Sequence, residues 1–167
     1  MFKLKEKIRI ELIKQLNKEL ESSQLYLNMA SWTEVNGFEG ISCFLYDHSE
    51  EERKHMLKLM KYLNKRGCLV TINNIVINNN NNSNSLEEIF QEIFYHERII
   101  SKNINFLVEL SLQEKDFFTY DFLQWYIKEQ MEEEILIKSF LDKIKLIGDS
   151  KTGLYIFDQE VKSNFKK

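Results

Sequence analysis

Acidic side chains interrupt four otherwise apolar stripes in this sequence. Read at alternating steps of three and four residues, each of four long segments gives one stripe that a helix would bury. Near the middle of every stripe a carboxylate replaces the expected apolar residue, and two stripes add a second polar residue three positions away. These residues are Glu19, Glu52 with His55, Glu97, and Glu133 with Gln130.

Buried carboxylates need a positive partner, and none of the stripes contains a lysine or an arginine. Like charges would force several of these carboxyl groups to bind protons, whereas divalent cations would neutralise them. We expect Glu19 and His55 on one side, Glu97 and Glu133 on the other, and Glu52 as a bridge. Oxygen ligands with one imidazole suit iron or manganese better than a thiolate-preferring metal. The alternative is that a stripe is misphased and its charges face solvent.

A second set of carboxylates lies beside the stripes. Glu51, Glu129 and Glu132 each precede a stripe residue by one position, or about 100° around a helix. Two interpretations stay open for this set. It is either a solvated acidic edge or a third, more exposed metal site that exchanges ions with the buried pair.

Four long helices would position these residues, at about 4–35, 38–66, 86–113 and 117–146. Proline is absent and only five glycines occur, which permits helices of this length. Ser85 with Glu88 predicts a capping box, and Asp116 predicts an N-cap. A short fifth helix is expected near 152–163. The fold class is therefore all-α, in a single domain that spans residues 1–167.

The connection at 67–85 is much longer than the other two. A segment of this length can return along the bundle, which predicts an up-down-down-up four-helix bundle with one long crossover. Apolar residues at 71–77 could dock on the bundle. The asparagine-rich tract at 78–84 is interpreted as a solvated loop.

Composition excludes several classes of function. The 167 residues include 23 basic and 26 acidic side chains, so a nucleic-acid partner is not expected. No apolar run approaches the roughly 20 residues of a membrane span, and the N-terminus does not read as a secretory signal. Cys43 and Cys68 are too few for a disulfide framework, so we expect a reducing cytoplasm.

Several stretches of the chain resemble a bacterial non-haem ferritin of the di-iron carboxylate superfamily. They are ELESSQLY at 19–26, HSEEERKH at 48–55, FLQWY at 122–126 and EQMEEE at 129–134. The resemblance implies a ferritin-like bundle with a ferroxidase centre. By this resemblance the first iron site is Glu19, Glu52 and His55; the second is Glu52, Glu97 and Glu133, with Gln130 beside both; the third is Glu51, Glu129, Glu132 and Glu133.

The same resemblance implies that two ferrous ions are oxidised by dioxygen or peroxide and stored as ferric mineral inside a homo-oligomeric shell of 24 subunits. Tyr26 matches a tyrosine that can donate an electron, although a hydrogen-bonded core tyrosine is an equal interpretation. Haem is not expected, because Arg53 follows Glu52 and the fourth helix lacks E-x-x-H. His48 is interpreted as a hydrogen-bonded core histidine. The alternatives are a soluble di-iron oxidase or peroxide scavenger without storage, and an inactive shell subunit.

Overall fold

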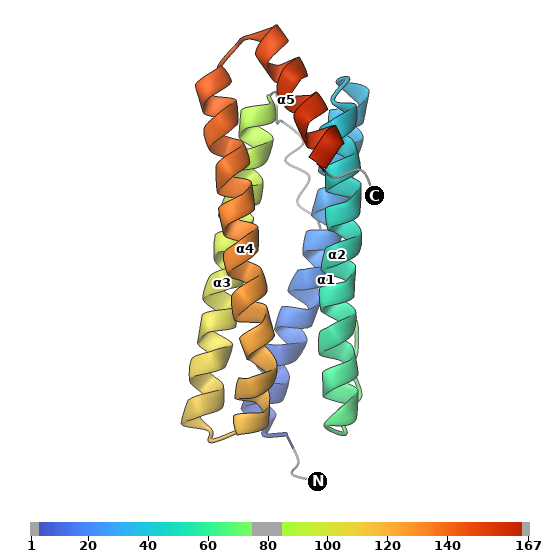
Figure 1. Cartoon of the computed structure of the whole chain (residues 1–167). Helices are drawn as coiled ribbons and strands as arrows, with labels where there is room; N and C mark the ends of the chain where they lie inside the picture. Colours follow the sequence, from blue (N-terminus) through green and yellow to red (C-terminus); the bar gives the residue numbers. More distant parts are fainter. Residues whose placement is uncertain (1–3, 75–84, 165–167) are drawn as a thin grey trace.

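Four long helices lie side by side, and a fifth crosses one end of them (Figure 1). The computed structural model describes residues 4–74 and 85–164. The helices are α1 (Glu6–Val35), α2 (Glu39–Lys65), α3 (Leu86–Gln113), α4 (Phe117–Ile147) and α5 (Lys151–Asn164), and the described residues include no strand. The predicted all-α bundle with a short C-terminal helix is confirmed.

The helix directions follow the predicted up-down-down-up order. In Figure 1, α2 ends at the same end of the bundle at which α1 begins, and α3 starts again at the opposite end. Helices α2 and α3 are therefore parallel. In the first part of the connection the Asn73 N–H donates to Asn17 Oδ1 at 2.9 Å, while Ile72 remains 48% exposed. Residues 75–77 of the expected docking segment and the tract at 78–84 lie outside the described residues.

Local sequence signals account for the helix ends. Ser85 Oγ accepts a hydrogen bond from the Glu88 N–H at 3.2 Å, which is the Ser85 half of the predicted capping box, and Asp116 Oδ1 accepts one from the Thr119 N–H at 3.2 Å, so Ser85 and Asp116 both act as N-caps. The turn between α1 and α2 places Gly37 at φ 83°, in the left-handed region that glycine tolerates best. These caps fix where α3 and α4 begin, and so fix the register of their polar stripe residues.

The buried apolar side chains form two clusters, one toward each end of the bundle. One cluster includes Phe44, Phe90 and Phe140, and the other includes Leu12, Leu59 and Leu123. Helix α1 packs chiefly on α2, and α3 packs chiefly on α4. The two apolar clusters leave a polar layer between them at mid-height, where the stripes are interrupted.

Helix α5 closes the bundle over the first of these clusters. Phe157 and Val161 are buried in it, and Asp158 Oδ1 accepts a hydrogen bond from the Ile41 N–H at 2.9 Å. A Cβ at Gly40 would lie 2.1 Å from the Asp158 carbonyl oxygen, so only glycine allows this approach. Among the described helices, none combines the length and hydropathy of a membrane span.

Candidate metal centre

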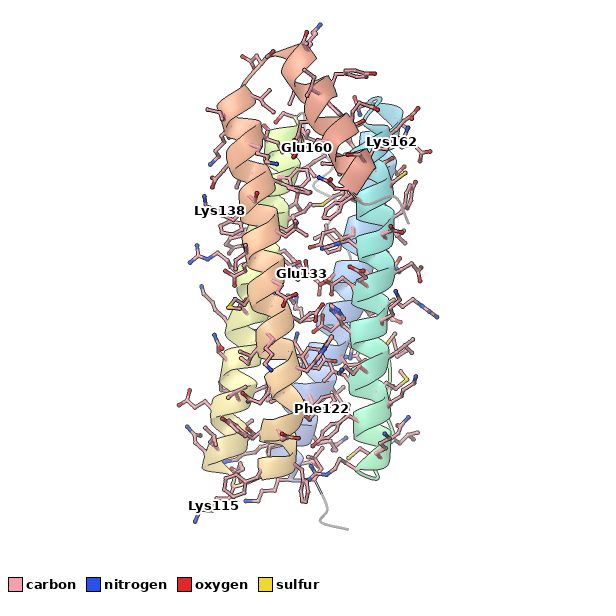
Figure 2. The ribbon with its side chains drawn as sticks, viewed as in Figure 1. Lys115, Phe122, Glu133, Lys138, Glu160 and Lys162 are labelled. Atoms are coloured by element: carbon pink, nitrogen blue, oxygen red, sulfur yellow. The ribbon has the colours of Figure 1, made fainter. Side chains whose placement is uncertain are left out.

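The four stripe carboxylates meet in the polar layer, one from each long helix. Glu19, Glu52, Glu97 and Glu133 are 1%, 3%, 1% and 7% exposed, and His55 is 8% exposed. Figure 2 shows Glu133 at mid-height on α4. In each helix the apolar residues of the stripe on either side of the carboxylate are buried in the bundle. They determine which face of the helix points inward, and so they bring the four carboxylates together. Within the described residues no lysine or arginine pairs with any of the five.

Glu19, Glu52 and His55 form the first group. Their ligand atoms all lie within 4.8 Å of one another, and His55 Nδ1 is 3.6 Å from Glu52 Oε2. The Glu19 and Glu52 carboxyl groups share a hydrogen bond. Gln15 Nε2 also donates to Glu19 Oε1 at 2.8 Å. Two carboxylate oxygens and one imidazole nitrogen are thus close enough together to bind one metal ion.

Neighbouring groups orient the imidazole of His55. The Trp125 ring stands edge-on to it with ring centroids 5.2 Å apart. Tyr126 donates from its hydroxyl to the His55 carbonyl oxygen at 2.8 Å. His55 Nε2 is also 3.9 Å from Glu129 Oε1. These contacts restrict the ring before any ion binds.

Glu97 lies opposite, between two hydrogen-bond donors. The Tyr26 hydroxyl donates to Glu97 Oε1. Gln130 Nε2 donates to Glu97 Oε2 at 2.5 Å and to the Glu97 carbonyl oxygen at 3.1 Å. Of the two roles open to Gln130, a ligand oxygen or a hydrogen bond, this geometry shows the hydrogen bond.

His48, Glu51 and Glu133 form a third group, which sequence reasoning did not assemble. His48 Nε2 is 2.6 Å from Glu133 Oε2, its Nδ1 is 3.5 Å from Glu51 Oε2, and the three could hold a metal ion. His48 is buried and hydrogen-bonded as expected, but its partner is a site carboxylate. The sequence did indicate that His48 could reach the centre, because it lies one turn before Glu52 in the same stripe.

The remaining predicted carboxylates lie farther out. Glu129 is partly exposed, with its Oε1 3.9 Å from His55 Nε2, and Glu132 is exposed on α4. Neither belongs to the group of His48, Glu51 and Glu133. The structure therefore brings two of the four residues expected at a third site into one cluster, together with a histidine.

The electrostatics of the centre favour bound cations. Burial, and then the neighbouring Glu52 charge, raise the pKa of Glu19 well above its usual range. Burial and the Glu97 charge do the same to the pKa of Glu52, and burial also raises the pKa of Glu97. Burial opposes the charged form of His48, but the hydrogen bond that His48 donates to Glu133, together with the negative charges of Glu133, Glu51 and Glu97, outweighs it, so the pKa of His48 rises. Without metal, protons must neutralise the site.

Comparison with known proteins agrees with this arrangement. A family model described as a ferritin-like domain matches residues 11–147. A bacterial non-heme ferritin of Campylobacter jejuni is 43% identical over 89% of each chain. One from Escherichia coli is 43% identical over 95% of each chain. Among solved structures, an open-pore ferritin from the archaeon Archaeoglobus fulgidus is 35% identical, covers 98% of each chain and has a TM-score of 0.93.

The agreement extends over nearly the whole chain in both sequence and structure, and residues 11–147, which the family model matches, include every side chain of the centre. This chain belongs to the ferritin family and is similar throughout to bacterial non-heme ferritins.

Proposed function

We propose that this protein is an iron-storage ferritin that oxidises ferrous iron at the centre described above. One observation carries the proposal: four buried carboxylates and a histidine converge between two apolar clusters, and no lysine or arginine of residues 4–74 and 85–164 pairs with them. Such a cluster is costly to bury unless it binds cations. The similar proteins are named ferritins, so we assign iron as the metal that this centre oxidises and that the protein stores.

Two ferrous ions are the substrate of this centre. Glu19, Glu52 and His55 would hold the first, and Glu52, Glu97 and Glu133 the second, with Glu52 shared between them. Two adjacent ions supply two electrons together, so one dioxygen and two protons give two ferric ions and one hydrogen peroxide. Carboxylate oxygens favour the ferric product because hard anions stabilise the higher charge. Dioxygen or peroxide is the proposed oxidant.

Neighbouring residues hold the ligands in place. Gln15 and Gln130 donate to Glu19 and Glu97, which restricts the rotation of both carboxylates. Tyr26 contacts Glu97 and is close enough to supply an electron during oxygen reduction. His48 with Glu51 and Glu133 is the proposed third site, and Glu129 and Glu132 form an acidic path beside it.

The proposal extends to assembly and location. Family membership supports a multi-subunit shell, and we propose 24 copies of this chain, with ferric mineral deposited in the interior. Two free thiols, Cys43 and Cys68, fit a reducing cytoplasm.

The test compares two single substitutions on α2. Glu52→Ala removes the shared ligand, and Glu50→Ala removes an exposed carboxylate two residues away. We expect stopped-flow oxidation of two ferrous ions per chain to slow by about 100-fold or more in Glu52→Ala, since both ions lose a ligand. Glu50→Ala should oxidise iron at the normal rate. Normal oxidation by a correctly assembled Glu52→Ala protein would overturn the site assignment.

A further inference from the structure

A basic groove lies between α2 and α4, on the side of the metal centre nearer the start of α4. Its cavity volume is about 420 Å³, and four of its seven lining residues are lysines. Figure 2 shows Phe122, which borders the groove on α4, below Glu133 in the same view. The lining consists of Lys54, Leu57, Lys58, Lys61, Tyr62, Lys65 and Phe122.

The lysines of this groove repel one another. Lys54, Lys58, Lys61 and Lys65 follow one another at steps of four, three and four residues, so they share one face of α2. Like charges one helical turn apart destabilise a helix. The groove lining contains no carboxylate. No ion pair within residues 4–74 and 85–164 involves any of the four.

Several lysines outside the groove are arranged differently. Lys138 pairs with Asp142, Lys143 with Glu160, and Lys162 with Glu39. Nearby Arg66 is also neutralised, because its Nη2 is 2.9 Å from Asp116 Oδ2. These basic side chains each have a carboxylate partner, whereas the four groove lysines have none among the described residues.

Packed aromatic rings line or border the groove. Tyr62 and Phe122 stack with ring centroids 3.9 Å apart and planes 10° from parallel. Lys58 Nζ lies 3.6 Å from the centroid of Trp125, the ring that also packs against His55. The Trp125 ring therefore contacts both the Lys58 ammonium group and the imidazole of His55.

We propose that this groove binds inorganic phosphate. Lysine ammonium groups bind phosphate as point charges, and an anion among them would remove their mutual repulsion. The same face of α2 changes sign along its length, from Glu51 at the third metal group to the lysines that begin one turn later. Cations and oxyanions would therefore gather side by side. Phosphate combines strongly with ferric ions, so the groove would supply it to the growing mineral; this role rests on the proposed function, but the binding does not.

The binding test uses the assembled, iron-free protein. Equilibrium dialysis with radiolabelled phosphate at constant ionic strength should show saturable binding. Replacing two groove lysines in Lys58→Gln/Lys61→Gln should weaken binding about tenfold or more. The matched control Lys102→Gln/Lys145→Gln changes net charge equally, at exposed lysines on α3 and α4, and should bind as the parent does. Lys58→Arg keeps the charge and should bind within about twofold of the parent.

Two results would overturn the proposal. One is non-saturable binding that excess chloride abolishes, which would indicate a diffuse ion atmosphere. The other is equal weakening in the groove and control variants. Sizing chromatography verifies that every variant assembles. If groove variants lose phosphate binding but deposit mineral with the same phosphate-to-iron ratio as the parent, the role in mineralisation is wrong and the site remains. If the parent binds phosphate but retains no iron, the proposed function fails instead.

Discussion

Replacing Glu52 by glutamine should stabilise the metal-free protein while reducing its stabilisation by metal. Glu52 is 3% exposed, shares a hydrogen bond with Glu19, and feels the charges of Glu97 and Glu133. Burial and these like charges raise the pKa of Glu52 well above its usual range, so its ionisation opposes folding. Glutamine has nearly the same shape, keeps a hydrogen-bonding group and carries no charge.

The size of the effect follows from this environment. Relief of unfavourable charge at a functional site commonly yields about 0.5–2 kcal/mol. For a chain of 167 residues, 1 kcal/mol shifts Tm by roughly 2–4 °C. A metal at 100 times its Kd adds about 2.7 kcal/mol to the parent through binding alone. The variant should therefore be more stable than the parent without metal and less stable with it.

The pH dependence has a definite sign. A carboxyl whose pKa is raised by folding favours the folded state below its unfolded pKa and loses that contribution as pH rises through its folded pKa. Near pH 4 the parent and the variant should therefore have similar Tm values. The advantage of the variant should grow as pH rises toward 7.

Differential scanning calorimetry of chelator-treated protein, with and without Zn²⁺ as a redox-silent ion, measures both effects at fixed subunit concentration. Glu50→Gln is the control, because it removes an exposed carboxylate from the same helix. The reasoning is refuted if Zn²⁺ raises the Tm of Glu52→Gln and the parent equally, or if the metal-free variant unfolds well below the parent at pH 7.

Three further predictions concern the surroundings of the centre. Because burial raises the pKa of Glu19 and Glu97, Zn²⁺ binding near pH 6 should release protons. The binding enthalpy, measured by titration calorimetry, should then depend on the ionisation enthalpy of the buffer. A binding enthalpy that is the same in every buffer would contradict this prediction. Tyr26→Phe removes a donor to Glu97 and should weaken Zn²⁺ binding about tenfold; an unchanged Kd in a competition assay would contradict it. Gly40→Ala places a Cβ 2.1 Å from the Asp158 carbonyl oxygen, so it should cost about 1–3 kcal/mol and lower Tm without slowing iron oxidation; an unchanged Tm would argue against this packing of α5.

Much of the fold followed from periodicity, because apolar residues at steps of three and four determine which face of a helix is buried. That face fixed the convergence of Glu19, Glu52, Glu97 and Glu133, since each lies between buried residues of its own stripe. The short turns and the long crossover fixed the helix order. The capping signals at Ser85 and Asp116 operated as the sequence indicated.

The side-chain partners could not be predicted in the same way. A residue about 100° from the stripe can turn inward or outward, depending on how far apart the neighbouring helices lie. Glu51 turns toward His48, whereas Glu132 faces outward. His96 lies next to Glu97 in the sequence, but its Nε2 is 2.7 Å from Ser22 Oγ on α1 and it is only partly exposed. These outcomes depend on helix spacing and side-chain rotamers, which sequence periodicity does not specify.

The most direct test of the account is the amount of iron retained per chain. Purified protein would be loaded with ferrous iron in air and passed through a sizing column, and the iron in the protein peak would be measured. A storage ferritin of 24 chains of 20.1 kDa each should elute near roughly 480 kDa with many iron atoms per chain. About two iron atoms per chain in a small oligomer would contradict storage and would indicate a di-iron oxidase instead.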